Sequence, residues 1–276
     1  MPEGPEIAKE ADRIRNYVKE CNIIIGIYWD KNSRYSTRDD IKNFHLAVYP
    51  MIVEKVFSRG KLIIIQCKNH NKEKIFLVSH LGMSGHWTKN KYKHSNLWVQ
   101  FGKREGEYWR EVFKLYYDDT RKFGSFSIYK DLQELYDKNG RCLMSAALKK
   151  YKNINSEYAA SKENFETFFK NKRLKNKKIC EFLMEQKYVS GVGNYLRAEI
   201  LHRCKIHPEK TLSSFSDKEI QILYNKTLEI IYKSYINQLE FQCYSQKCDK
   251  QGNSVETYKD SKKRTVHFVP KVQTKN

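Results

Sequence analysis

Seven short runs of β-branched and aromatic residues lie between residues 22 and 129, with no helical segment between them. They are NIIIGIYW, MIVEKVF, KLIIIQC, EKIFLVSHL, SNLWVQF, EVFKLYY and GSFSIY, and clusters of Gly, Asn, Lys and Asp separate them. Strands that follow one another at such short intervals are typical of antiparallel sheets. This half of the chain is therefore predicted to form an antiparallel β-sandwich or barrel.

The rest of the chain carries the spacing of helices. Apolar residues from Ile7 to Val18 recur at helical intervals and predict one amphipathic helix before the strands. Beyond residue 131 the segments ENFETFF, KKICEFLMEQ, NYLRAEILHRC and SDKEIQILYNKTLEIIYKSYI show the same spacing, and residues 149–162 are interpreted as the interdomain connection. From Gln242 two strand-like stretches, SVETYK and RTVHF, predict a terminal hairpin. We expect an α+β protein with domains at residues 1–130, 131–241 and 242–276.

The net charge of the chain is +20, with 52 Lys and Arg residues against 32 Asp and Glu. An excess of this size attracts polyanions, of which nucleic acid is the commonest. A solvated surface, an anionic membrane surface and AT-rich coding DNA are alternative explanations. No apolar run reaches the ~18–20 residues of a membrane span. The seven scattered cysteines contain no Cys-x-x-Cys pair, so we expect a soluble, intracellular protein with reduced thiols.

The first six residues, MPEGPE, place a proline beside a carboxylate. Removal of Met1 would leave Pro2 with a free secondary amine, and α-amino groups titrate near ~7.7–8, so part of the population is nucleophilic at neutral pH. Glu3 brings a carboxyl group within reach for proton transfer. This pair suits attack on a sugar carbon and formation of a Schiff base. An ordinary helix start, with proline and acidic residues in the first turn, explains the same residues.

Gly191-Val192-Gly193 joins two of the predicted helices. Glycines permit close backbone approach, and the free amides at the start of the following helix can bind an anion. Asn194, near that helix start, would either cap the helix or hydrogen-bond a phosphate. A glycine pattern of this kind is common in helix connections and is a weak signal by itself.

Five motifs occur in order along the chain: PEGPEI at the N-terminus, RGK at 59–61, SHLGMSG at 79–85, DDTRKFG at 118–124 and QKYVSGVGNYLRAE at 186–199. Together they resemble the formamidopyrimidine-DNA glycosylase/endonuclease VIII family of base-excision repair enzymes. The resemblance spans residues 1–208. It implies a β-sandwich domain joined to a helical domain that bears a helix–two-turn–helix motif.

The resemblance also implies roles for individual residues. Pro2 would be the nucleophile, and Glu3 would protonate the sugar ring oxygen. Lys61 stands where the family has a lysine that contacts DNA phosphate and supports catalysis, although a solvated strand-end lysine is the alternative. Glu6 matches a second carboxylate near the active site, or else complements the helix dipole. Asn194 matches a phosphate-binding asparagine.

Three further residues, Met83, Arg121 and Phe123, correspond to those that fill the gap left by an everted lesion. Removing a base from the stack costs on the order of a few kcal/mol, and an apolar wedge with a guanidinium facing the orphaned base offsets part of that cost. Met83 and Phe123 would be core residues in the alternative interpretation, but the glycines around them favour exposed loops.

The C-terminal hairpin departs from the four-cysteine zinc finger that is usual in the family. The segment RTVHFVPKVQ has Val269 and Val272 where cysteines would fall, and only Cys243 and Cys248 lie nearby. The hairpin resembles the zincless finger of certain animal endonuclease VIII-like glycosylases, in which Arg264 would contact phosphate. We expect no zinc and no other cofactor, with the hairpin held by its own strand pairs and packing.

The sequence as a whole predicts a bifunctional DNA glycosylase and AP lyase, on the endonuclease VIII side of the family, that removes oxidised bases from damaged double-stranded DNA and cleaves the strand by β,δ-elimination. Oxidised pyrimidines are the expected preference, with formamidopyrimidines as co-substrates. A preference for formamidopyrimidines and 8-oxoguanine is the alternative, because the motifs mix features of both branches of the family. A non-catalytic lesion-binding protein is the rival from another class. We further expect a monomer that also accepts single-stranded DNA.

Overall fold

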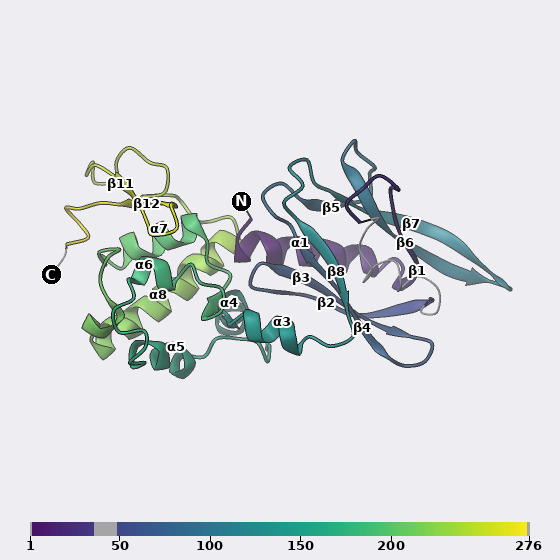
Figure 1. The fold of residues 1–276 in the computed structure, drawn as a ribbon, viewed down its shortest axis with the longest axis horizontal. Coiled ribbons are helices and arrows are strands. Elements are labelled where there is room, and N and C mark those ends of the chain that lie inside the picture. Colours follow the sequence, from purple (N-terminus) through teal and green to yellow (C-terminus); the bar gives the residue numbers. More distant parts are fainter. Residues whose placement is uncertain (1, 36–48, 275–276) are drawn as a thin grey trace. The chain divides into compact units, whose positions relative to one another are not determined.

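The computed structural model describes residues 2–35 and 49–274, and its contacts divide the chain into two compact units (Figure 1). The first unit contains Pro2 and Glu6–Leu135, and the second contains Glu3–Pro5 and the residues from Tyr136 onward. Strands dominate the first unit and helices the second. The α+β class predicted from the two periodicities is confirmed.

Eight strands of the first unit form one antiparallel sheet in the order β5-β7-β6-β1-β2-β3-β4-β8. The strands are β1 Ile23–Trp29, β2 Met51–Arg59, β3 Leu62–Asn69, β4 Lys74–His80, β5 His86–Thr88, β6 Ser95–Glu105, β7 Tyr108–Asp118 and β8 Ser125–Tyr129. Each of the seven apolar runs forms a strand, because alternate side chains can enter the core. The three-residue β5 was not predicted.

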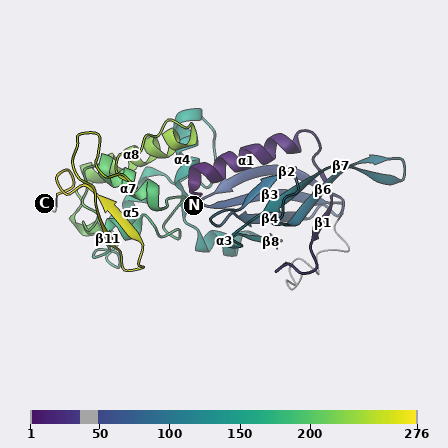
Figure 2. The same cartoon turned by 90° about the horizontal axis from the view of Figure 1, so that it is seen from above.

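The sheet folds over a single apolar core. Trp87 of β5 contacts Phe126 of β8, at the other end of the strand order, with ring centroids 5.8 Å apart. The Trp87 indole N–H also donates to Ser79 Oγ of β4 (3.1 Å). Helix α1 (Gly4–Val18) packs its apolar residues from Ile7 to Ile14 into this core (Figure 2). The two ends of the sheet therefore face each other, which gives the two-layer packing expected of a sandwich.

The second unit is built mainly from helices. They are α4 Leu143–Lys152, α5 Lys162–Phe169, α6 Ile179–Phe182, α7 Asn194–Arg203 and α8 Asp217–Tyr235, with α3 Gln133–Lys138 at the division, the 3₁₀-helix Leu212–Ser214, and the short parallel strands β9 Arg141–Cys142 and β10 Val189–Ser190. The start of α8 is fixed by a capping box between Ser216 and Glu219. Among the described residues, no helix has the length and apolar character that crossing a membrane requires.

Residues 149–162 do not connect the two units, so that prediction is wrong. Residues 149–152 are the last turn of α4, a helix that packs against α8. Ala160 is buried, and its carbonyl accepts a hydrogen bond from the Tyr224 hydroxyl (2.7 Å). The polar composition that suggested a linker belongs to the solvent-facing end of a helix and the loop after it, which a sequence cannot distinguish from a linker.

The chain ends in the hairpin that the sequence predicted. Strands β11 (Glu256–Lys259) and β12 (Thr265–Phe268) pair antiparallel, with Tyr258 opposite Val266. In the turn between them, Asp260 Oδ1 accepts from the backbone N–H groups of Lys262 (3.0 Å) and Arg264 (2.9 Å). The Asp side chain thus supplies the turn with local acceptors.

Candidate active site

The carboxylate of Glu3 lies at the N-terminus of helix α7 and accepts three backbone hydrogen bonds. Its Oε2 accepts from Gly193 N (2.7 Å) and Leu196 N (3.2 Å), and its Oε1 accepts from Tyr195 N (2.9 Å). Glu3 is only 1% exposed. The first N–H groups of a helix have no partner within the helix, so they are available to fix an acidic side chain in place.

Gly193, directly before α7, leaves the space that the Glu3 side chain occupies. A Cβ atom at Gly193 would lie 2.3 Å from Glu3 Cδ, which no real contact permits. Close by, the N–H of Gly4 donates to the carbonyl of Gly191 (2.8 Å). The sequence predicted close backbone approach and an anion at these amides; the anion that the structure places there is the chain's own carboxylate.

Asn194, the first residue of α7, is tied to a buried arginine. Its Oδ1 accepts from Arg197 Nη2 (2.5 Å), and the same nitrogen donates to the carbonyl of Thr265 (2.8 Å). Arg197 Nη1 donates to Asp260 Oδ2 (2.9 Å), and both side chains of this ion pair are 1% exposed. Asn194 is therefore fixed, through Arg197, to the turn of the terminal hairpin.

Arg264 joins the same network from the hairpin. Its Nε donates to Asp260 Oδ2 (3.0 Å), the oxygen that also binds Arg197. Its Nη2 has no hydrogen-bond partner among the residues that the structure describes. Asp260 thus binds two guanidinium groups at once, and the Nη2 atom of Arg264 is itself buried.

Lys61 occupies the tight turn between β2 and β3 in the first unit, beside His80 at the end of β4. Leu62 and His80 are cross-strand partners. Burial lowers the pKa of His80, the positive charge of Lys61 lowers it further, and the Asp119 carboxylate opposes the shift. Burial and Lys61 therefore favour the uncharged form of the His80 ring, and its Nδ1 accepts from the backbone N–H of Gly82 (3.2 Å).

Two loops carry the three residues predicted to fill the gap in DNA. Met83 is 41% exposed and Phe123 is 59% exposed. The guanidinium carbon of Arg121 lies 5.2 Å from the centroid of the Phe123 ring. The alternative that Met83 and Phe123 belong to the core does not hold, because both large apolar side chains face solvent.

The same two loops are joined beneath their exposed tips. Gly82 has a φ of +64°, and a Cβ there would lie 2.4 Å from Gly124 N. The buried Asp119 accepts from Ser84 Oγ (2.7 Å) of one loop and from Gly124 N (2.7 Å) of the other. Met83, Arg121 and Phe123 therefore project from two loops that are joined to each other by hydrogen bonds to Asp119.

The site residues expected from the sequence fall into two groups. The first unit holds Pro2, Glu6 in the first turn of α1, Lys61, Met83, Arg121 and Phe123, and the second unit holds Glu3, Asn194 and Arg264. Sequence reasoning missed the supporting residues His80, Asp119, Arg197 and Asp260. The first three lie inside the recognised motifs, where they were readable as candidates, whereas nothing marked Asp260.

The residues at the finger do not fit a four-cysteine zinc site. Val269 is fully buried and packs with Cys243 and Ala198, with Val272 at the edge of the cluster. Cys248 is exposed. Within the described part of the chain, no group of three or more His, Cys, Asp and Glu residues is placed to hold a metal ion. Apolar side chains offer no ligands, so Val269 and Val272 cannot replace the cysteines of such a site.

Comparison with known proteins agrees with this geometry. Residues 1–126 match the model of the formamidopyrimidine-DNA glycosylase N-terminal domain, and residues 154–241 match the H2TH domain of the same enzymes. The two matches cover well over half of the 276 residues. The chain belongs to the formamidopyrimidine-DNA glycosylase family. It is thereby placed among the DNA glycosylases of base-excision repair.

Relatives of known sequence carry the same family name. The formamidopyrimidine-DNA glycosylase of Rickettsia bellii is 30% identical over 249 residues, covering 86% of this chain and 78% of the relative. That of Mycoplasma pneumoniae is 28% identical over 239 residues, covering 85% and 78%. These names favour the formamidopyrimidine branch of the family over the endonuclease VIII branch.

Solved structures share the fold over the whole chain. Lactococcus lactis formamidopyrimidine-DNA glycosylase, bound non-covalently to DNA containing an AP site, matches with a TM-score of 0.73 and 24% identity, covering 99% of this chain and all of that one. The same enzyme in complex with DNA containing an oxidised pyrimidine matches with a TM-score of 0.72, 24% identity and the same coverage. At this level of identity the likeness shows the fold.

Proposed function

We propose that this chain is a bifunctional DNA glycosylase and AP lyase in which Pro2, freed by removal of Met1, is the nucleophile and Glu3 is the proton shuttle. The observation that carries the proposal is the Glu3 carboxylate, which directly follows Pro2 and is buried against three amides of the α7 N-terminus. An acid fixed in this way, one residue from a secondary amine, suits the chemistry of a sugar carbon.

The proposed reaction begins when the Pro2 nitrogen attacks C1′ of the damaged nucleotide. The bond between C1′ and the base breaks, and its electron pair leaves with the base. The departing base takes a proton from water. The Glu3 carboxylate takes the N–H proton of Pro2 and passes it to the sugar ring oxygen, so that the ring opens and an iminium forms between Pro2 and C1′. Loss of a proton from C2′ then expels the 3′ phosphate, a second elimination expels the 5′ phosphate, and water releases the free enzyme.

Damaged double-stranded DNA is the proposed partner, bound by a monomer. Lys61, Asn194 and Arg264 would contact its phosphates, in keeping with the net charge of +20. Met83, Arg121 and Phe123 would fill the space of the everted base, because all three are exposed on loops with a fixed scaffold. The Lactococcus relative is solved with AP-site DNA, which supports this choice of partner.

Oxidised pyrimidines are the proposed preference, with formamidopyrimidines as co-substrates and 8-oxoguanine as a poor one. The complex of the Lactococcus enzyme with an oxidised pyrimidine supports acceptance of such bases by this fold. The names of the relatives favour a second range, in which formamidopyrimidines are the better substrates. Activity on single-stranded DNA is a further part of the proposal.

Borohydride trapping tests these statements together, since it reduces the iminium to a stable protein–DNA adduct. Oligonucleotides would carry thymine glycol, dihydrouracil, a formamidopyrimidine, 8-oxoguanine or an abasic site. The protein with a processed N-terminus should form adducts, and a form with residues added before Pro2 should form none, because its amine has become an amide. A C-terminally extended form is the control. Specific binding without any adduct would support the non-catalytic rival.

A further inference from the structure

We infer that Arg34 is a positioning residue that sets the loop bearing Arg121 and Phe123 for insertion into DNA; this inference rests on the proposed function. Arg34 Nη1 donates to the carbonyl of Lys122 (2.5 Å), and Nη2 donates to the carbonyl of Gly124. These two acceptors flank Phe123 on either side. One guanidinium group therefore binds the backbone carbonyls immediately before and immediately after Phe123. We call the loop that carries Arg121 and Phe123 the wedge loop.

The backbone that Arg34 binds has an unfavourable conformation at Lys122. Lys122 adopts a φ of +57°, in the left-handed region that is unfavourable for a residue with a side chain. The tight segment also brings Gly124 against Tyr117, whose hydroxyl donates to the carbonyl of His80 (3.0 Å). Two charge-assisted hydrogen bonds from a single planar group are well suited to hold such a conformation.

Arg34 itself is held in place by a second set of contacts. Its Nη2 lies 3.8 Å from Asp119 Oδ2 and 3.0 Å from the Tyr35 hydroxyl. Its guanidinium carbon lies 5.1 Å from the centroid of the Tyr35 ring. Asp119 is the same carboxylate that joins the wedge loop to the loop of Met83 through Gly124 and Ser84. The wedge loop is therefore held by two side chains: Asp119 accepts from the N–H of Gly124, and Arg34 donates to the carbonyls of Lys122 and Gly124.

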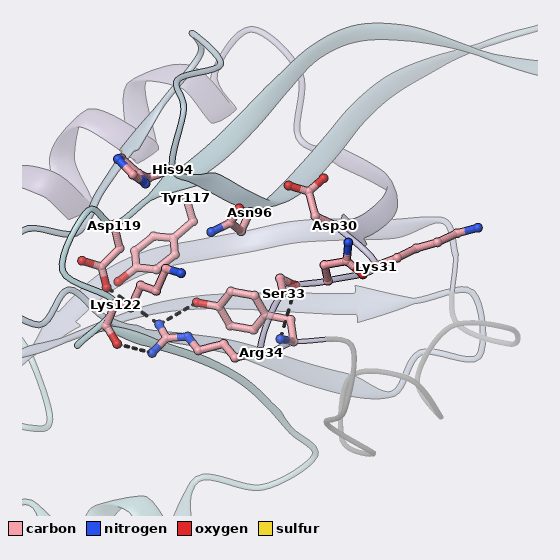
Figure 3. A pocket seen from close by; sticks show the side chains of 11 residues that line it. Asp30, Lys31, Ser33, Arg34, His94, Asn96, Tyr117, Asp119 and Lys122 are labelled. Atoms are coloured by element: carbon pink, nitrogen blue, oxygen red, sulfur yellow. Dashed lines mark hydrogen bonds and ion pairs between the residues drawn. The ribbon is translucent and has the colours of Figure 1, made fainter.

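A cavity of about 490 Å³ lies between residues 30–35 and the wedge loop, beside the contacts that Arg34 makes with that loop (Figure 3). One wall is made by residues 30–35 and the other includes Tyr117, Asp119 and Lys122. Arg34 links the two walls, and the dashed bonds of Figure 3 show its contacts with the wedge side. Among the residues that the structure describes, the contacts from Arg34 to the loop across this cavity are polar.

The contacts that Arg34 makes with the wedge loop matter for the reaction because the loop must enter the duplex when a base is everted. The wedge compensates for lost stacking only if it enters the duplex in a fixed geometry, and a mobile loop would lose conformational entropy on insertion. Arg34 should therefore affect steps that need the gap to be filled. It should not affect amine attack on an abasic site in single-stranded DNA, where there is no opposite base and no gap.

The test compares Arg34→Gln with Lys31→Gln, which removes one positive charge from the same cavity wall. Single-turnover excision of a lesion from duplex DNA would be measured with 2-aminopurine placed opposite the lesion as a stacking reporter. We expect Arg34→Gln to slow excision from duplex DNA by about 10- to 100-fold, as loss of charge-assisted hydrogen bonds implies. The increase in 2-aminopurine fluorescence that accompanies eversion should also be smaller. Borohydride trapping on a single-stranded abasic oligonucleotide should match the wild type, and Lys31→Gln should match it in every assay.

Equal duplex rates for Arg34→Gln and the wild type would overturn the inference, as would equal losses on duplex and single-stranded substrates. Thermal unfolding would accompany each assay. If Arg34→Gln melts early, Arg34→Lys decides the question, because it keeps the charge but cannot donate a planar pair of bonds to both carbonyls; it should show the same duplex-selective loss in smaller degree. Failure of the wild type itself to form any adduct would instead refute the proposed function.

Discussion

Arg197 and Asp260 form a fully buried ion pair, with Nη1 and Oδ2 2.9 Å apart and each side chain 1% exposed. The pair joins helix α7, which carries Asn194, to the turn of the hairpin, which carries Arg264. Two residues proposed to bind phosphate thus depend on one carboxylate. The hairpin is attached to the helical unit by charge and hydrogen bonds as well as by the apolar cluster around Val269.

Asp260→Asn should therefore destabilise the protein and weaken its binding to DNA. Removing one partner of a buried pair costs about 3–5 kcal/mol, because the other charge stays buried without compensation. Glu240→Gln, which breaks an exposed pair with Lys250, is the control and should change little. Urea unfolding and DNA titration would measure both variants. Identical effects of the two substitutions would contradict the assigned role of Asp260.

The same aspartate predicts an acid response. Burial alone would raise the pKa of Asp260, but the hydrogen bond from the Arg264 backbone and the contacts with Arg197 outweigh it, and the pKa lies below its usual value. A lowered folded pKa contributes stability that is present above about pH 4, the unfolded value, and is lost as the pH falls through the folded pKa. Asp260→Asn should flatten that acid limb of the stability profile.

Glu3→Gln should abolish excision of intact damaged bases far more than cleavage of pre-formed abasic sites. Base loss requires protonation of the ring oxygen, whereas an abasic aldehyde is already open to attack by the amine. Parallel single-turnover assays on the two substrates would measure the ratio. Glu20→Gln, a change on the exposed surface of the first unit, is the control. Equal loss on both substrates would indicate a different acid or a folding defect.

Gly193→Ala should reproduce the selective defect of Glu3→Gln without altering any ionisable group. The new Cβ would lie 2.3 Å from Glu3 Cδ and would displace the carboxylate from its three amides. Gly106→Ala in the first unit is the control for a destabilising glycine substitution: its Cβ meets nothing within 4 Å, but its φ of +63° disfavours a side chain, so it should lower stability without the selective defect. An active Gly193→Ala enzyme with normal base excision would show that the position of Glu3 is not critical.

Lys61→Ala and Arg264→Ala should each weaken DNA binding and reduce its dependence on salt. Each phosphate contact contributes roughly one unit to the slope of log affinity against log salt concentration. Arg264→Lys keeps the charge and should keep most of the slope. Titrations at several salt concentrations decide the matter, and an unchanged slope for the alanine variants would place these side chains away from DNA.

Chelation should leave activity intact. Val269 packs with Cys243 and Ala198, and Val272 borders the same cluster, where a four-cysteine finger would need ligands. Enzyme treated with a chelator should retain full activity, and elemental analysis of active protein should find no stoichiometric zinc. Activity lost to the chelator and restored by zinc would refute this prediction.

The sequence by itself determined the kind and order of the longer strands and helices, but not the short strand β5 or the end of helix α4. The alternating runs specified strands and the 3.6-residue spacing specified helices, because burial of one face requires that period. Ordered motifs also identified the family and the residues Pro2, Glu3 and Lys61 as candidates. The position of the connection between the two units could not be predicted, because a mainly polar segment such as residues 149–162 is expected both in a linker and at the exposed end of a helix.

Only the tertiary structure decided how those candidates are held. Glu3 meets the amides of Gly193, Tyr195 and Leu196 from the other end of the chain, and Arg34 meets the carbonyls of Lys122 and Gly124. Backbone N–H and carbonyl groups are the same in almost every residue, so a sequence carries no mark of which one a distant side chain will bind. That choice is made when the folded chain brings the groups within hydrogen-bonding distance.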